Sequence, residues 1–293
     1  MLPRLRCLAQ LCDSGNPSGN EDGFCIDETY ALVLDGATGL GDSVLNGSAS
    51  DASWFVERFA NCLAQARRKE HATLAALRQA LEAVAQAWRD QVKKDLPMYR
   101  LPSAGMVLVA LEGDELVMVR LGDCELFAQY VPGQYESDFE ISRVFSNSPL
   151  HDLDRHALQA VTALRDSGYL LSEALREIRP MLQAHRDQLN TPSGYAALSV
   201  ARLEQMVPDV KRVPVNTVKR LLLVSDGFSA AWQLYGLDSP ARWLATETPQ
   251  ATLNDLLYRL RETERQDPEG QHFPRFKCHD DATAVLLEIT PSV

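Results

Sequence analysis

The stretch YALVLDG (Tyr30–Gly36) contains the pattern that decides the fold of this 293-residue chain. Its first five residues predict a strand, and an Asp-Gly pair follows the strand directly. The same order returns much later in the chain, in LLLVSDG (Leu221–Gly227). Because strand ends bring distant parts of a chain to one rim, we expect Asp35 and Asp226 to lie close together. Glycine after each aspartate permits the sharp turn that such a strand end needs.

Three further acidic motifs lie beside apolar runs or in a flexible loop. They are Asn20–Gly23 in a Gly/Ser-rich loop, Gly122–Cys124 after the apolar run 116–121, and Asp280–Thr283 before the last apolar run. Each motif by itself is also typical of an ordinary turn, a helix N-cap or a solvated loop. Their occurrence together, in this order, favours a functional site over a set of separate turns.

A cluster of these acids needs a positive partner. Like charges raise each other's pKa, so several carboxylates do not gather without neutralisation. A hard divalent cation neutralises them, and carboxylate oxygens are the ligands that such ions prefer. The motifs therefore predict a metal-dependent hydrolase.

The composition limits the partners of the protein. The hydrophobic fraction of 45% suffices for a folded core, and the formal net charge is 29 − 40 = −11. This acidity argues against binding of nucleic acid, which requires basic surfaces, and against anionic membrane surfaces. An acidic protein can still process a phosphate ester if metal ions reverse the local charge.

The cysteines and the N-terminus carry no sign of export. None of the six cysteines has C-x-x-C spacing, which argues against a zinc knuckle or a thioredoxin-like site. A disulfide framework is not expected in a chain of this size, so we expect a cytoplasmic location. The N-terminus shows no apolar stretch of signal-peptide length, and no segment has the apolar run that a membrane helix requires.

The order of the predicted elements indicates the fold class. Apolar runs predict strands over 4–12, 24–35, 104–111, 116–121, 124–130, 219–224 and 283–289. Helical spacing predicts helices after the N-cap Ser50, over 71–96, within 151–190, and over 239–247 and 252–264. The irregular alternation suits an α+β fold with antiparallel sheets covered by helices. We expect a single domain, 1–293, with a helical or flap insertion around 150–215, and polar strand ends and a loop over 131–150.

In chain order, the motifs resemble the signature of the metal-dependent type 2C (PPM) serine/threonine protein phosphatases, as found in bacterial members. The matching pieces are Asn20–Asp22, Asp35–Gly36, Ser103–Gly105, Gly122–Cys124, Ser225–Gly227 and Asp280–Thr283. They extend over nearly the whole chain. The resemblance implies a four-layer α-β-β-α sandwich of two mainly antiparallel sheets flanked by helices, in agreement with the predicted order of elements.

The resemblance also implies a reaction and a set of ligands. Asp35 would bridge two Mn²⁺ or Mg²⁺ ions, Gly36 would offer its carbonyl to one of them, and Asp226 and Asp280 would hold the other. A water that bridges the ions would attack a phosphoserine or phosphothreonine monoester directly. The substrate would be a phosphorylated protein or peptide.

Three more residues receive roles from the same resemblance. Glu21 and Asp22 would orient metal-bound waters, and Asp123, together with Asp226, would hold a possible third ion. His279, beside Asp280, is a candidate acid for the leaving group, although a loop histidine is more often structural or solvated.

The chain also departs from the family pattern. Pro17 stands where the family usually has an arginine that binds the substrate phosphate. Arg100, Arg120 and Arg275 are conceivable substitutes, and the sequence does not choose among them. The usual glycine pair after Asp-Gly is replaced by Ala37–Gly39, and the usual aspartate-serine by Asp123-Cys124.

These departures leave an alternative open, namely a catalytically weak or inactive binding or regulatory module on the same fold. An aspartyl-phosphate phosphatase, by contrast, is excluded, because that chemistry needs a second aspartate where this chain has Ala37. The segment Asn190–Tyr195 predicts a defined turn, either part of a flap near the active site or an ordinary surface loop.

Overall fold

The structure is a computed structural model that describes residues 3–15, 17, 19–45, 47–133 and 141–290. The loops expected over 13–23 and 131–150 therefore lie partly outside the described residues. Within the described ranges, no helix is long and apolar enough to cross a membrane.

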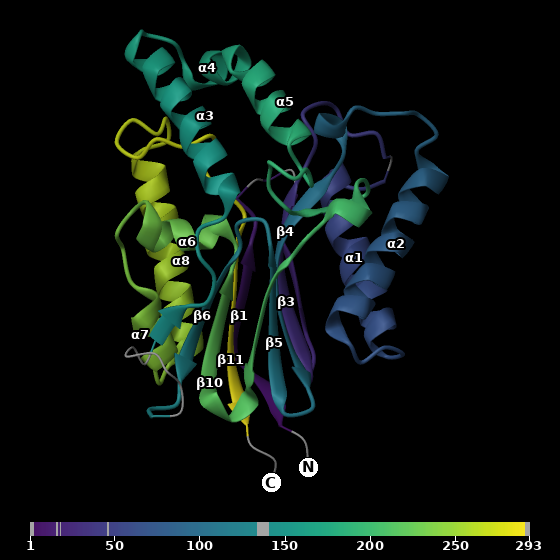
Figure 1. Cartoon of the computed structure of the whole chain (residues 1–293). Coiled ribbons are helices and arrows are strands. Elements are labelled where there is room, and N and C mark those ends of the chain that lie inside the picture. Colours follow the sequence, from purple (N-terminus) through teal and green to yellow (C-terminus); the bar gives the residue numbers. More distant parts are fainter. Residues whose placement is uncertain (1–2, 16, 18, 46, 134–140, 291–293) are drawn as a thin grey trace.

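The described strands form two antiparallel sheets that lie face to face (Figure 1). The first sheet has the order β1 (Arg4–Asp13), β11 (Ala282–Thr290), β10 (Val218–Val224), β6 (Glu125–Tyr130), β7 (Ile141–Arg143). The second has the order β2 (Gly23–Ile26), β3 (Tyr30–Ala37), β4 (Ser103–Glu112), β5 (Glu115–Leu121), β9 (Asp209–Pro214), and β8 (Leu198–Ser199) pairs with β4.

Helices cover the outer face of each sheet (Figure 1). The second sheet is covered by α1 (Asp51–Arg67) and α2 (Thr73–Gln91), and the first by α6 (Asp226–Gln233), α7 (Pro240–Ala245) and α8 (Pro249–Gln266). A further group, α3 (Pro149–Asp166), α4 (Leu171–Glu177) and α5 (Arg179–Asp187), stands at one end of the sheets. Short 3₁₀ turns lie at Met98–Arg100, Leu203–Gln205 and Val215–Thr217. The predicted α+β fold, a four-layer α-β-β-α sandwich, is confirmed.

The strand β3 shows why its apolar run is continuous. Leu32 and Leu34 belong to the core beneath α1 and α2, whereas Ala31 and Val33 belong to the core between the two sheets. Successive side chains of a strand point to opposite faces, so a strand covered on both sides needs apolar residues at every position. Full burial of each such leucine or valine contributes about 1.5–3 kcal/mol.

Several predicted elements have different bounds. The strand expected over 24–35 is a hairpin, because Asp27 accepts hydrogen bonds from the backbone N–H and the hydroxyl of Thr29 at 3.0 and 2.9 Å and turns the chain. The helix expected over 71–96 ends at Gln91, before Pro97. Ser50 caps α1 as predicted, since its hydroxyl accepts a hydrogen bond from the N–H of Ser53 at 3.0 Å.

Two other differences concern the pairing of one strand and the number of helices in one region. The strand expected over 124–130 follows the β4–β5 hairpin in the chain, but β6 pairs with β10 in the opposite sheet. The helical region 151–190 is three helices, and Pro180 stands in the first turn of α5, where a helix tolerates proline. Strands β8 and β9 were not predicted, because neither has a recognisable apolar alternation.

Candidate active site

The two Asp-Gly pairs meet where the facing sheets end. Asp35 lies near the end of β3, and Asp226 begins α6 directly after β10. The backbone N–H of Asp226 donates a hydrogen bond to the Asp35 carboxylate at 3.3 Å. The structure therefore brings together the two acids that the strand-end pattern selects.

Further acids line the same cleft, which has a volume of about 550 Å³. The predicted residues among its lining are Glu21, Asp35, Gly36, Asp123, Asp226 and Asp280. Asp22 lies deeper, with 9% of its surface exposed, and does not line the cleft. Asp154 of α3 also lines it and was missed, because a single aspartate within a polar helix gives no signal in the sequence.

The close approach of these carboxylates shifts their protonation. Burial, together with the negative charge of Asp226, raises the pKa of Asp35 well above its usual range. Burial chiefly, and neighbouring carboxylates in addition, also raise the pKa values of Asp22 and Asp123, although hydrogen bonds from Ser225 and Thr283 partly oppose the rise at Asp22. Burial and Asp226 likewise raise the pKa of Asp280 to about 6 and that of Asp154 to about 7. The site thus lacks sufficient positive charge of its own.

Glu21 is held in place by its neighbours. Its carboxylate accepts hydrogen bonds from the Thr38 hydroxyl and, at 3.4 Å, from the Thr38 backbone N–H. Its own backbone N–H donates to Asp281 at 2.7 Å, and its carbonyl accepts from the N–H of Gly36 at 3.2 Å. Thr38, one of the departures from the family pattern, therefore serves to fix Glu21 at the rim of the cleft.

Both glycines of the Asp-Gly pairs are required by close packing. A Cβ atom on Gly36 would lie 2.3 Å from the carbonyl oxygen of Glu21. A Cβ atom on Gly227 would lie 2.0 Å from the carbonyl oxygen of Asp281. Any larger residue would push apart the segments that carry the acids, so these glycines fix the geometry of the cleft.

The chemistry of the donors fits a hard divalent cation, because every predicted ligand offers a carboxylate or carbonyl oxygen. Within the described residues, however, no three His, Cys, Asp or Glu side chains already stand in ligand geometry. Instead, the ammonium group of Lys277 lies 2.5 Å from Asp280 and supplies local positive charge. A cation on Asp280 would require Lys277 to release it.

The three arginines considered as phosphate ligands are engaged elsewhere. Arg100 donates to the carbonyl of Asp42 at 2.8 Å. Arg120 is buried and binds Asp209 and the carbonyl of Ser146. All three nitrogens of the Arg275 guanidinium donate to protein oxygens. None of the three lines the large cleft, and Arg275 borders a smaller, adjoining hollow instead.

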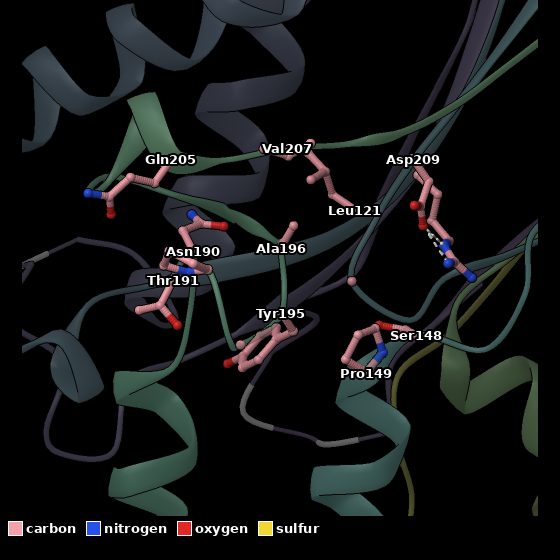
Figure 2. A pocket seen from close by; sticks show the side chains of 14 residues that line it. Leu121, Ser148, Pro149, Asn190, Thr191, Tyr195, Ala196, Gln205, Val207 and Asp209 are labelled. Atoms are coloured by element: carbon pink, nitrogen blue, oxygen red, sulfur yellow. Dashed lines mark hydrogen bonds and ion pairs between the residues drawn. The ribbon is translucent and has the colours of Figure 1, made fainter.

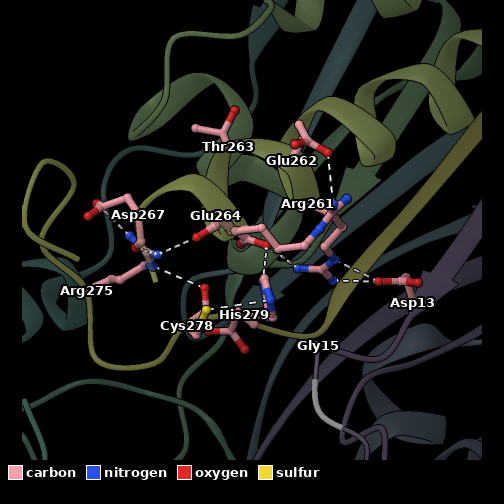
Figure 3. A network of polar contacts seen from close by, with 12 residues as sticks. Asp13, Gly15, Arg261, Glu262, Thr263, Glu264, Asp267, Arg275, Cys278 and His279 are labelled. Carbon is pink, nitrogen blue, oxygen red and sulfur yellow. Dashed lines mark hydrogen bonds and ion pairs between the residues drawn. The ribbon is translucent and has the colours of Figure 1, made fainter. Parts of the chain in front are cut away.

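His279, the candidate acid for the leaving group, contacts a buried glutamate and does not line the large cleft. Its Nδ1 lies 2.8 Å from the carboxylate of Glu264. Figure 3 shows this pair within a network of polar contacts beside the loop that leads to β11. The geometry supports the structural alternative for His279.

The segment Asn190–Tyr195 is a defined turn, as predicted. Asn190 has a left-handed backbone with φ 51°, and its side chain binds the N–H and the carbonyl of Ala197 at 3.1 and 3.0 Å. Figure 2 shows this turn at a smaller pocket of about 260 Å³. Tyr195 lines both this pocket and the large cleft, so the turn borders the candidate site.

The solved structures that resemble this chain include bacterial serine/threonine phosphatases. The catalytic domain of the serine/threonine protein phosphatase PstP, in complex with 2 manganese ions, is 18% identical, with a TM-score of 0.58 over 99% of this chain and 100% of that chain. The Mycobacterium tuberculosis phosphatase PstP/Ppp is 17% identical (TM-score 0.57, 98% and 99% covered). Stp1 from Staphylococcus aureus is 16% identical (TM-score 0.55, 99% and 96% covered). At these identities the likeness establishes the fold.

The family follows from the sequence model of protein phosphatase 2C, which matches residues 20–266. The chain belongs to this family. A search of curated proteins found no match. The family match includes Asp22, Asp35, Asp123 and Asp226 and ends before Asp280, so the assignment of Asp280 rests on the motif and on its place in the cleft.

Proposed function

We propose that the protein is a metal-dependent phosphatase that hydrolyses phosphoserine and phosphothreonine monoesters in cytoplasmic proteins or peptides. The observation that carries the proposal is the gathering of Asp35, Asp226 and Asp280 in one open cleft at the end of the two sheets. Within the protein phosphatase 2C family, this cleft is the natural place for the reaction.

The proposed ligands are residues of the cleft that offer carboxylate or carbonyl oxygens. Asp35 and the carbonyl of Gly36 would hold one ion, Asp35 and the pair Asp226 and Asp280 a second, and Asp123 with Asp226 a possible third. Two Mn²⁺ or Mg²⁺ ions would lower the pKa of a water for direct attack and offset negative charge on the phosphoryl group.

The surrounding residues would orient this set. Glu21, fixed by Thr38, presents a carboxylate at the rim that can accept a proton or a hydrogen bond from water. Asp22 lies behind the ligands, and one of its carboxylate oxygens has no hydrogen-bond partner among the described residues. A buried, unsatisfied oxygen costs about 1–3 kcal/mol, which suits an acceptor that is completed when the site is loaded.

The test is hydrolysis of an aryl phosphate and of a phosphothreonine peptide, with and without Mn²⁺. We expect turnover only with the metal, and its loss in Asp35→Asn and Asp226→Asn. Asp95→Asn, a matched change at an exposed residue after α2, should keep wild-type activity. Undiminished turnover by the cleft variants, or turnover independent of metal, would contradict the proposal.

A second candidate function is a binding or regulatory module of the same fold. Two observations favour it: Pro17 in place of the phosphate-binding arginine, and the ion pair that Lys277 makes with Asp280. Calorimetry separates the two functions. A regulatory module would bind a phosphopeptide while turnover stayed undetectable with Mn²⁺, Mg²⁺ and other divalent ions.

A further inference from the structure

The cleft presents an electrostatic problem for a phosphorylated substrate. Its described lining includes six acids, Glu21, Asp35, Asp123, Asp154, Asp226 and Asp280. A phosphate monoester carries nearly two negative charges at neutral pH, and repulsion between charges in a partly desolvated cleft is strong. A protein cation at the cleft would offset this repulsion, in addition to any bound metal ions. The basic side chains in the described lining are His185, Arg186 and Lys277.

Arg186 is already used as a structural tie. Its guanidinium donates to the Ser103 hydroxyl at 2.6 Å and to the carbonyls of Ala37 and Thr38 at 2.8 and 2.9 Å. These bonds join α5 to the ends of β3 and β4. Turning Arg186 toward a phosphate would break all three bonds.

His185 is a poor cation at neutral pH. Burial, and secondly the neighbouring His156, lower its pKa below the ordinary value. The two imidazole rings lie with their centroids 5.7 Å apart, so protonation of one disfavours protonation of the other. His185 therefore contributes little positive charge to the cleft.

Lys277 carries a positive charge that a single carboxylate holds. Among the described residues it forms one ion pair, with Asp280 at 2.5 Å, and 57% of its side chain is exposed. It borders both the large cleft and the adjoining hollow of about 290 Å³. Because the lysine side chain is flexible, its ammonium group can exchange one oxygen partner for another without disturbing the fold.

Polar contacts fix the residues on both sides of Lys277, and Figure 3 labels Arg275, Cys278 and His279 among them. On one side, Arg275 donates to the carboxylate of Asp267 at 3.1 Å and to the carbonyl of Cys278 at 3.1 Å. On the other side, His279 contacts the buried carboxylate of Glu264 at 2.8 Å, and Arg261 contacts it at 2.9 Å. The backbone of Lys277 is therefore fixed, while its side chain can still turn. A fixed backbone limits the conformational entropy that is lost when the ammonium group binds a ligand.

We propose that Lys277 is the group that binds the phosphate of the substrate. The proposal rests on the proposed phosphatase function. In the unloaded protein, Lys277 neutralises Asp280. Once a divalent cation takes that carboxylate, the ammonium donates its hydrogen bonds to phosphoryl oxygens at the same end of the cleft. The ion pair with Asp280 keeps the lysine within reach until then.

The test compares Lys277→Met and Lys277→Arg with Lys69→Met, a matched change in the turn between α1 and α2. Calorimetry measures the binding of inorganic phosphate to Mn²⁺-loaded protein, and kinetics measures KM and kcat for a phosphothreonine peptide. We expect Lys277→Met to weaken phosphate binding and to raise KM by about 10-fold or more, as for the loss of a charged hydrogen bond. Lys277→Arg should recover part of this loss, and Lys69→Met should change neither quantity.

Two results would overturn the proposal. One is unchanged phosphate affinity in Lys277→Met, or no phosphate binding by the wild type. The other is a gain in Mn²⁺ affinity alone, which would limit Lys277 to an occupant of the Asp280 carboxylate. If the wild type binds phosphate but hydrolyses no ester with any metal, the proposed function fails, and the phosphate titrations still decide the role of Lys277. Circular dichroism confirms that each variant is folded.

Discussion

The two halves of the cleft are built in different ways. Asp35 and Asp226 stand at the ends of central strands, whose positions are set by backbone hydrogen bonds across each sheet. Lys277 and Asp280 stand in the irregular segment 267–281, whose position is set by side chains such as Arg275, Asp267 and Glu264. The first half needs no particular side chain outside the core, whereas the second depends on a few buried charges.

This difference predicts which changes affect the chemistry and which affect the fold. Removing an acid from the strand ends should change activity and leave the sheets intact. Removing a charge from the network of Figure 3 should destabilise the segment 267–281 and only then alter the site. The following predictions test this division, from the largest expected effect to the smallest.

Asp35→Asn should have the largest effect on activity. We expect a loss on the order of 10²–10³-fold or more in kcat, comparable to removing one electrostatic contact to a transition state. In EDTA, however, the variant should be more stable than the wild type, since burial and nearby carboxylates oppose a charge at Asp35. Thermal unfolding with and without Mn²⁺ measures this. A variant that was both inactive and less stable in EDTA would contradict the comparison.

Arg275→Met should have the largest effect on stability. Asp267 is buried, with 6% of its side chain exposed, and Arg275 is largely covered, with 11% exposed. Removing one partner leaves a buried charge unpaired, which costs about 3–5 kcal/mol in the free energy of unfolding. Urea denaturation measures this loss. The matched control is Arg265→Met, since Arg265 is 53% exposed in its ion pair and should contribute no more than about 1 kcal/mol. Equal losses in both variants would show that the network does not hold the segment.

Gly227→Ala should have an intermediate effect on both stability and activity, because Gly227 lies where the two halves of the cleft contact each other. Its Cβ would lie 2.0 Å from the carbonyl oxygen of Asp281, so the strand-end half and the segment 267–281 must separate. Overpacking of this kind costs about 1–3 kcal/mol, and kcat should fall as well. At Gly41 an added Cβ meets only the flexible end of Arg100, so Gly41→Ala is the control. Stability and kcat unchanged in Gly227→Ala would contradict the close packing.

The smallest expected effect is a dependence of stability on pH in EDTA. Burial and Asp226 raise the pKa of Asp154 to about 7, above its value of about 3.9 in the unfolded chain. The folded state therefore binds the proton more tightly, and this contribution to stability is present at low pH and lost as pH rises from about 4 through 7. Asp154→Asn should show a shallower decline over this range. Identical pH profiles for the two proteins would contradict the shift.

The sequence predicts the strand-end half of the cleft better than the half formed by the segment 267–281. The run Tyr30–Gly36 indicated a strand with an acid at its end, and Leu221–Gly227 indicated a second strand of the same kind. Short-range patterns suffice for such elements, because each strand is apolar throughout and its turn residues follow directly. The fold class and the meeting of Asp35 with Asp226 could therefore be predicted.

The side-chain network could not be predicted in this way. Nothing in the sequence pairs Arg275 with Asp267 or His279 with Glu264, because such contacts depend on tertiary packing. Arg275 was accordingly considered as a phosphate ligand, although its guanidinium is fully used inside the segment. Lys277 escaped notice, since a single lysine in a polar loop is usually solvated.

The central claim is that acids from separate strands form one site for divalent cations. The most direct measurement is a crystal of the protein soaked in Mn²⁺ and examined for anomalous scattering. The account predicts peaks within coordination distance of Asp35, shared with Asp226 and Asp280, and an ammonium of Lys277 that has left Asp280. Peaks elsewhere on the molecule, or none beside Asp35 at saturating Mn²⁺, would contradict it.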